Sequence, residues 1–330
     1  MVPSIKYDGM MLVYGGIDEA GYGPMFGPLC VGSCVLVLKD HDPADGAPDI
    51  WDMLDHIICR KRKDAKSKIA VNDSKQLKSN AKKKALTHLE RGVFAFMSAM
   101  GIEPPTCDTD FFNELHCTPA NFPWYGSITN LPIGNDVNML RIDCSRLRSA
   151  LDTANISCEH MECTAVDVEK YNERTAHATK SALNFSIAMQ HANRIVQKFP
   201  TEHPRLMIDR HGGKIKYRND LQLFWPEAKI QVLIENPSMS RYRLNINGKL
   251  ATMTFASKSD ERHMPAALAS MIAKYTRELQ MLRFNRYFID RMPELKPTAG
   301  YVQDGRRFLQ EIEPILAQNG IKRELLVRSS

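Results

Sequence analysis

The order of apolar segments constrains the fold of this chain more than any other feature of its sequence. Two β-branched apolar runs, residues 11–17 and 29–38, flank a turn rich in Gly and Pro, and this pattern predicts a hairpin of two strands. Shorter apolar runs at residues 205–209, 229–235 and 250–260 predict three further strands.

Segments with helical periodicity alternate with these strands. An apolar stripe at three- and four-residue spacing predicts a helix over residues 175–198. Helices are also expected over residues 80–100, over residues 265–287, where Pro265 stands at the first helical position, and over residues 304–317. The order hairpin, helix, strand, helix, strand favours an α/β layered fold with a mixed central β-sheet flanked by helices.

The chain has 330 residues, enough for one large α/β domain with a sizeable insertion. Residues 103–161 differ in character from the rest, because Pro, Gly and Asn are frequent there and periodicity is weak. We interpret residues 1–330 as a single domain and residues 103–161 as an insertion within it.

The composition excludes several classes of protein. The hydrophobic share of 43% and the charged share of 25% are typical of a water-soluble globular protein. No segment approaches the run of about 20 apolar residues that a membrane helix requires, and Asp8 and Gly9 interrupt the start of the chain before a signal peptide could form. The eight cysteines form no CxxC pair and no zinc-ligand spacing, so we expect free thiols in a cytoplasmic protein.

The net charge is +6, but basic and acidic residues are unevenly distributed. Residues 60–84 hold eleven Lys or Arg against Asp64 and Asp73, a net charge of +9, whereas residues 103–163 hold nine acids and three arginines, a net charge of −6. A basic block beside an acidic one suggests that one surface meets a polyanion. A solvated, lysine-rich helix and loop would explain the same pattern, so charge alone leaves both interpretations open.

Four acidic residues stand where strands end or helices begin: Asp18, Glu19, Asp209 and Asp260. Taken singly, each could be an ordinary turn or capping residue. Taken together, their carboxylates would suit two Mg²⁺ or Mn²⁺ ions about 3.5–4 Å apart, the arrangement that supports phosphodiester hydrolysis. Because neighbouring strand residues point to opposite faces, we expect the glycine-rich break after Glu19 to bring it beside Asp18, or Glu19 to contribute its main-chain oxygen.

Several motifs, taken in order, resemble one protein family. "GIDEAGYGPMFGP" (residues 16–28) resembles the D-E-A-G-R-G-P signature of the type 2 ribonucleases H, ribonuclease HII above all. "NDSKQL" (residues 72–77) is similar to the D-S-K-x-L segment of that family, and "LMIDR" (residues 206–210) to the strand with its third catalytic Asp. "SDERHMPAALASMIAKYTRELQM" (residues 259–281) and "AGYVQDGRRFL" (residues 299–309) resemble its later elements.

This resemblance implies a ribonuclease H-like fold and endonucleolytic hydrolysis of the RNA strand of RNA–DNA hybrids, leaving 5′-phosphate and 3′-hydroxyl ends. It implies catalytic and metal-binding roles for Asp18, Glu19, Asp209 and Asp260, with Mg²⁺ or Mn²⁺ as cofactor. The substrate-binding residues that it implies are Gly21, Tyr22, Gly23, Ser74, Lys75, Ser270, Lys274 and Tyr301. The C-terminal helical segment, residues 290–330, is implied to contribute through Tyr301, which would pack beside the 2′-hydroxyl that distinguishes RNA from DNA. We expect a monomer whose partner is the hybrid, with no membrane involved.

The sequence departs from the family pattern at Tyr22, where the family has an arginine. A tyrosine lacks the charge and the forked donors of a guanidinium, so we expect cleavage of longer hybrids more than incision at single embedded ribonucleotides. Ribonuclease HIII also lacks that arginine, but it ends its tetrad with Glu where this chain has Asp260. Two other interpretations stay open: a nucleic-acid-binding protein with altered chemistry, and a DNA nuclease on the same fold.

Overall fold

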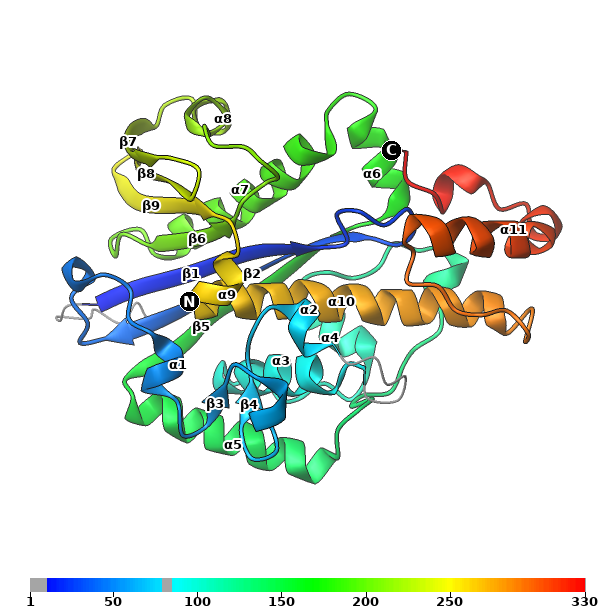
Figure 1. Ribbon diagram of the computed structural model, residues 1–330, viewed down its shortest axis with the longest axis horizontal. Coiled ribbons are helices and arrows are strands. Elements are labelled where there is room, and N and C mark those ends of the chain that lie inside the picture. Colours follow the sequence, from blue (N-terminus) through cyan, green and yellow to red (C-terminus); the bar gives the residue numbers. More distant parts are fainter. Residues whose placement is uncertain (1–10, 79–84, 330) are drawn as a thin grey trace.

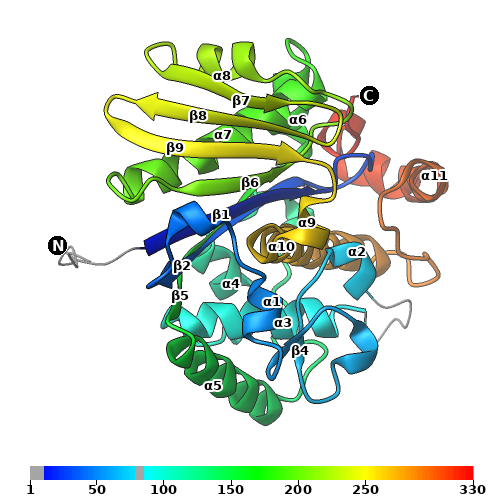
Figure 2. The ribbon, with the colours of Figure 1, turned by 60° about the vertical axis from the view of Figure 1, so that its left-hand side comes forward.

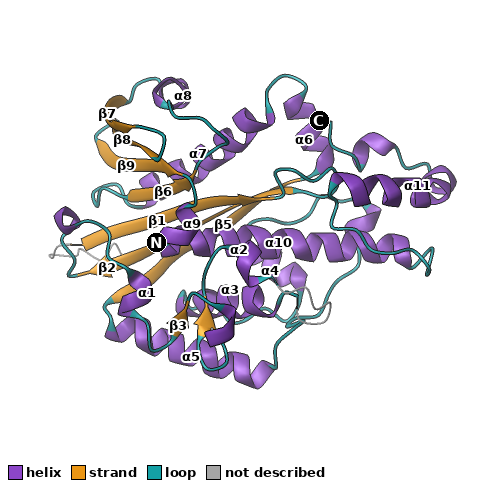
Figure 3. Ribbon diagram, in the orientation of Figure 1, coloured by secondary structure: helices purple, strands orange, loops and turns teal. Residues whose placement is uncertain are grey.

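The centre of the computed structural model, which describes residues 11–78 and 85–329, is a seven-stranded mixed sheet (Figure 3). Its strand order is β5-β2-β1-β6-β9-β8-β7. The strands are β1 (Met11–Ala20), β2 (Leu29–Lys39), β5 (Ile156–Val166), β6 (Arg205–Asp209), β7 (Lys229–Glu235), β8 (Met239–Ile246) and β9 (Lys249–Ala256). A separate small sheet pairs β3 (Ile58–Cys59) with β4 (Ile69–Ala70).

The strand directions make the sheet mixed. An antiparallel meander of β1, β2 and β5 lies on one side, and β6 and β9 continue the sheet parallel to β1. The antiparallel strands β8 and β7 extend the other edge. A mixed central sheet of this kind, with helices between its strands in the sequence, confirms the predicted layered α/β fold class.

Helices cover both faces of the sheet (Figures 1 and 2). The helices are α1 (Ile50–Met53), α2 (Ser74–Leu77), α3 (Thr87–Ala99), α4 (Asp108–Glu114), α5 (Val137–Thr153), α6 (Val168–Thr175), α7 (Lys180–Lys198), α8 (Arg218–Phe224), α9 (Ser259–Arg262), α10 (Met264–Ile289) and α11 (Val302–Asn319). One face packs on α10, with α3 and α5 beneath it, and the other face packs on α7. No helix in the described ranges combines the length and apolar character needed to span a membrane.

The long helix α10 is buried on nearly every side, and its first part, up to Ala273, consists of apolar or small residues. It approaches β1 so closely that a Cβ atom at Gly16 would collide with the backbone of Pro265. Glycine is therefore required at residue 16, and the close contact fixes the start of α10 against the strand that ends in the predicted acids.

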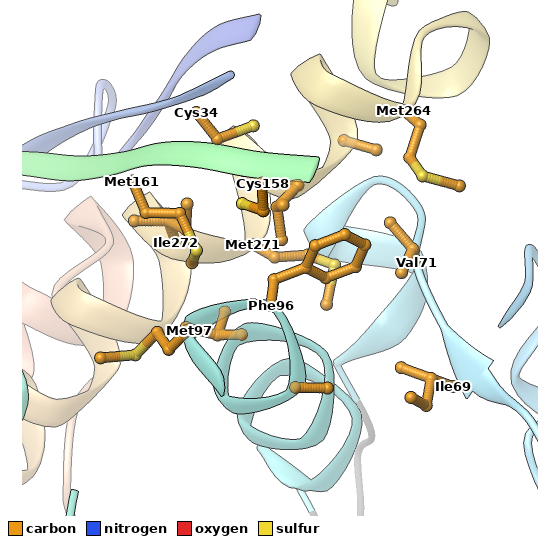
Figure 4. Close-up of a cluster of buried hydrophobic side chains, with 14 of the residues drawn as sticks. Cys34, Ile69, Val71, Phe96, Met97, Cys158, Met161, Met264, Met271 and Ile272 are labelled. Atoms are coloured by element: carbon orange, nitrogen blue, oxygen red, sulfur yellow. The ribbon is translucent and has the colours of Figure 1, made fainter. Parts of the chain in front are cut away.

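The largest core cluster fills the space between the sheet, α10 and α3 (Figure 4). Met271 of α10 and Phe96 of α3 are fully buried, and Cys158 and Met161 reach them from β5. Burial raises the pKa of the Cys158 thiol to about 12, so this cysteine behaves as an apolar packing residue. All eight cysteines are free.

The observed elements differ from the predicted ones in several places. Residues 103–161 contain α4, α5 and the first part of β5, an edge strand of the main sheet that the sequence analysis did not predict. The helix predicted over residues 175–198 is observed as α7 from Lys180 to Lys198, because its N-cap is Thr179, and Thr175 is instead the last residue of α6. The helix predicted from residue 80 is observed from Thr87, and residues 80–84 lie outside the described residues. The interpretation of 103–161 as an insertion stays a prediction.

Candidate active site

The predicted acids meet at one edge of the sheet because three strands run parallel. β1, β6 and β9 share a direction, so their carboxyl ends lie at the same edge. Asp18 and Glu19 lie near the end of β1, and Asp209 is the last residue of β6. Asp260 belongs to the short helix α9, which follows β9 directly and precedes α10 (Figure 2).

Every predicted site residue lines one pocket of about 330 Å³, which we call the acidic pocket. Its lining contains Asp18, Glu19, Gly21, Tyr22, Gly23, Ser74, Lys75, Asp209, Asp260, Ser270, Lys274 and Tyr301. Ligand atoms of Asp18, Glu19 and Asp209 all lie within 4.8 Å of one another, whereas Asp260 lines the pocket outside that tight group. The structure thus brings these residues together, and their catalytic roles remain predictions.

The strand β1 continues through Asp18 and Glu19 and ends at Ala20, and the glycine-rich break expected after Glu19 begins at Gly21, whose φ is +85°. The ladder between β1 and β6 ends at Ile17, which leaves the β6 side of β1 open beyond that residue. We infer that the longer side chain of Glu19 reaches round this open edge toward Asp18. On the opposite face of the sheet, Asn184 of α7 donates a hydrogen bond to Glu19, with 3.1 Å between Nδ2 and Oε2.

Burial and mutual repulsion raise the free energy of the ionised form of these carboxyl groups. Burial is the main reason why the pKa of Asp18 lies well above its usual value, and the charge of Glu19 is the next cause. Burial also raises the pKa of Glu19 and of Asp209. Buried like charges of this kind favour either protonation or a bound cation.

The donor set fits a hard divalent cation. Three carboxylates with converging ligand atoms offer oxygen, the ligand that Mg²⁺ and Mn²⁺ prefer. A cation would remove the repulsion that raises these pKa values, and would replace protons as the neutralising charge. The residues that would hold it are Asp18, Glu19 and Asp209, with Asp260 beside them.

Asp260 gives the site a measurable pH dependence. Burial, followed by the charge of Asp73, raises its pKa from 3.8 to about 7. A carboxyl whose pKa is raised by folding adds stability that is complete below about pH 4 and is lost as the pH rises through about 7. In chelator, the gain in thermal midpoint of Asp260→Asn over the wild type should therefore be small at pH 5 and larger at pH 8.

The wild type alone would not reveal the effect of Asp260, because buried histidines change the stability with pH in the opposite direction. Burial lowers the pKa of four histidines to about 4, and these residues destabilise the fold as the pH falls: His160, His203, His211 and His263. They are present in both proteins, so they cancel in the difference. A gain that stays constant from pH 5 to pH 8 would contradict the raised pKa of Asp260.

Some of the predicted substrate-binding residues already have partners within the protein. The Ser270 hydroxyl donates to the Ser74 hydroxyl at 3.1 Å. Lys274 forms an ion pair with Glu278, with 3.0 Å between Nζ and Oε1, so part of its charge is already neutralised. Burial alone would lower the pKa of Lys75, but the charge of Asp73 and the nearby acids outweigh burial and raise it. Lys75 therefore stays protonated beside the acids.

Two aromatic side chains stand at the pocket. Tyr301 is 54% exposed and caps the start of α11, so its ring is available to a ligand. Tyr22 lies with its ring 5.4 Å from the ammonium group of Lys180. The lysine thus places a positive charge near Tyr22, where the family pattern has an arginine.

The glycine-rich loop after β1 is held by buried arginines from distant parts of the chain. Arg328 donates to the carbonyl oxygens of Gly21 and Gly27, and its guanidinium lies 4.6 Å from the ring centre of Tyr171. Burial and the charge of Arg277 lower the pKa of Arg328 to about 10, so it remains charged at neutral pH. These bonds fix the loop that lines the acidic pocket.

Five lining residues were not predicted: Ala20, Pro24, Asp73, Lys258 and Glu261. Asp73 stands inside the "NDSKQL" motif and caps α2 by accepting from the backbone N–H of Lys75, so the motif was a usable signal. Asn184 also escaped the sequence analysis. It lies within the amphipathic helix α7 and carries no signal in a single sequence, because its partner Glu19 is 165 residues away.

No family model matches the sequence, and no curated protein matches it. The chain is similar in structure to ribonuclease HII of Archaeoglobus fulgidus, which was solved in a complex with PCNA. The two sequences are 17% identical, 96% of this chain and 94% of that chain are covered, and the TM-score is 0.43. For ribonuclease H2 of Pyrococcus horikoshii OT3 the identity is 17%, the coverage 96% and 92%, and the TM-score 0.45. For Bst ribonuclease HIII in complex with Mn²⁺ the identity is 15%, 97% of this chain and 67% of that chain are covered, and the TM-score is 0.40.

Proposed function

We propose that this protein is an endoribonuclease that uses Mg²⁺ or Mn²⁺, at a site for two ions, to hydrolyse the RNA strand of RNA–DNA hybrids. The observation that carries the proposal is the acidic pocket, which is lined by Asp18, Glu19, Asp209 and Asp260 together with the residues that the family motifs implicate in substrate binding. The raised pKa values of these acids also support it, because a pure binding protein gains nothing from buried, repelling carboxylates.

Each group has a distinct role in this proposal. The bound cations would supply activation of water and neutralisation of charge at the scissile phosphate. Asn184 holds Glu19 in place through its hydrogen bond. Lys75, protonated beside the acids, attracts the phosphate backbone. Tyr301, exposed at the pocket, stacks on the sugar that carries the 2′-hydroxyl. The protein acts as a monomer.

A single gel tests the activity. The purified protein is incubated with Mg²⁺ or Mn²⁺ and one of three end-labelled duplexes: an RNA–DNA hybrid, a DNA duplex with one embedded ribonucleotide, and plain DNA. We expect the hybrid to be cut, leaving 5′-phosphate and 3′-hydroxyl ends, and the reaction to stop in EDTA. Because Tyr22 replaces an arginine, the single ribonucleotide should be the weaker substrate.

The other duplexes decide between the alternatives. Cleavage of plain DNA at the rate of the hybrid would favour a DNA nuclease and overturn the proposal. Binding of the hybrid without cleavage under either metal would favour a nucleic-acid-binding protein with altered chemistry.

A further inference from the structure

A second and larger cavity, of about 690 Å³, lies on the same face of the sheet as the acidic pocket. No described residue lines both cavities. Tyr14, which lines the larger one, stands four residues before Asp18 on β1 and points to the same face. Four residues of strand correspond to about 13 Å, so the two sites are neighbours along one strand.

Three arginines line this cavity, which we call the arginine cavity. The strand register places Arg205 of β6 and Arg243 of β8 on either side of Thr252 of β9. Arg241 lies two residues along β8, opposite Thr254. Because side chains alternate across a strand, all three guanidinium groups project from the same face of the sheet, away from the buried Tyr242 between the two β8 arginines.

Within the described part of the chain, none of these three arginines forms an ion pair. Arg205 donates to the Thr252 hydroxyl at 2.8 Å, and Nε of Arg241 donates to the Thr254 hydroxyl at 3.1 Å. The one acid in the described lining, Asp42, accepts from the backbone N–H of Ala44 at 2.8 Å.

The positive charges in the cavity act on one another. Burial lowers the pKa of Arg205, and the charges of Arg243 and Arg241 add to the effect. The neighbouring His203 has its pKa lowered to about 4, first by burial and then by the charge of Arg205, so it is neutral at pH 7. The three arginines therefore repel one another, and Asp42, the acid in the described lining, is not ion-paired with any of them, so an anionic ligand would relieve the repulsion.

We propose that the arginine cavity binds the phosphate groups of a ligand of nucleotide size. Guanidinium groups match phosphate oxygens in both charge and geometry, and two threonine hydroxyls stand between them. Leu12, Met207 and Leu233 give the cavity an apolar part that suits a ring or a sugar face. The volume falls in the range of small-molecule sites. The phosphate comes either from a free nucleotide or from the backbone of a nucleic-acid strand, and this binding is independent of hydrolysis in the acidic pocket.

Calorimetric titration of the full chain tests the proposal. The probes are pyrophosphate, adenosine diphosphate and a ten-nucleotide single-stranded DNA, each in EDTA so that no metal enters the acidic pocket. The double variant Arg241→Gln/Arg243→Gln removes two guanidinium groups, and Arg218→Gln removes an exposed arginine of α8 outside the cavity. We expect the wild type and Arg218→Gln to bind alike, the double variant to bind at least about tenfold more weakly, and added salt to weaken binding.

The three probes distinguish the source of the phosphate. Loss of pyrophosphate or nucleotide binding in the double variant identifies a free ligand, and loss confined to the oligonucleotide identifies a strand. Equal affinities of wild type and double variant for all probes, or no binding of any probe, would overturn the proposal. Because the arginines repel one another, the unliganded double variant should melt no lower than the wild type. If it does melt lower, Arg243→Gln alone gives the same test, since this side chain is exposed.

Discussion

Replacing Asp209 by Asn should reduce the rate of hybrid hydrolysis by about 10³-fold or more, a loss of about 4 kcal/mol of transition-state stabilisation. The amide keeps the shape of the carboxyl group but removes the negative charge at the end of β6, where ligand atoms of Asp18, Glu19 and Asp209 converge. Metal affinity should fall with the rate, since the cation loses an anionic ligand. Single-turnover cleavage of a labelled hybrid at several Mn²⁺ concentrations measures both effects.

The same substitution should not weaken the metal-free fold. The folded-state pKa of Asp209 is raised by burial, so the ionised carboxylate is a cost that the amide avoids. Asp152→Asn, an exposed residue of α5, is the matched control and should change neither rate nor stability. Full activity of Asp209→Asn would show that hydrolysis does not depend on the acidic pocket.

Replacing Gly21 by Ala should destabilise the protein by about 2–4 kcal/mol and impair hydrolysis. The backbone of Gly21 has φ of +85°, and a Cβ atom there would lie 2.5 Å from Nε of Arg277 and 2.8 Å from the carbonyl oxygen of Pro28. Both a strained backbone and a steric clash follow, directly beside Glu19. Urea unfolding measures the first effect, and hybrid cleavage measures the second.

The same loop supplies a matched control at Gly23. A Cβ atom at Gly23 would meet nothing within 4 Å, and its φ lies outside the left-handed region. Gly23→Ala should therefore change the free energy of unfolding by less than about 0.5 kcal/mol. Equal destabilisation by both substitutions would contradict the conformation of this loop.

The sequence predicted the parts of the fold whose patterns are local. The strand β6 and the strand β7 have the predicted bounds, and α10 was predicted within two residues at each end, because Pro265 and a long apolar pattern mark it. The common edge of the predicted acids follows from the parallel pairing of β1, β6 and β9. A single sequence does not show which strands pair, so the convergence of the four acids could be expected only from the resemblance of the motifs to a known family.

The missed strand β5 shows why other parts could not be predicted. It carries His160 and Glu162 in its middle, and polar residues of this kind do not indicate a strand whose side chains are largely buried. Their burial depends on partners elsewhere: Arg194 of α7 donates to Glu162 at 2.7 Å, and the Ser33 hydroxyl bonds with His160 at 3.1 Å. These partners come together only in the assembled fold, so the polar residues of β5 hide its strand character when the sequence is read alone.

The bonds of Arg328 to the carbonyl oxygens of Gly21 and Gly27 have a consequence for synthesis of the chain. Arg328 follows Gly27 by 301 residues and Gly21 by 307 residues, so a growing polypeptide exposes the loop long before the arginine leaves the ribosome. Folding of the sheet can proceed on the nascent chain, because β9 and α10 come earlier in the sequence. The bonds that hold the loop beside Glu19 can form only after residue 328 has been synthesised, so the acidic pocket is completed later than the sheet beneath it.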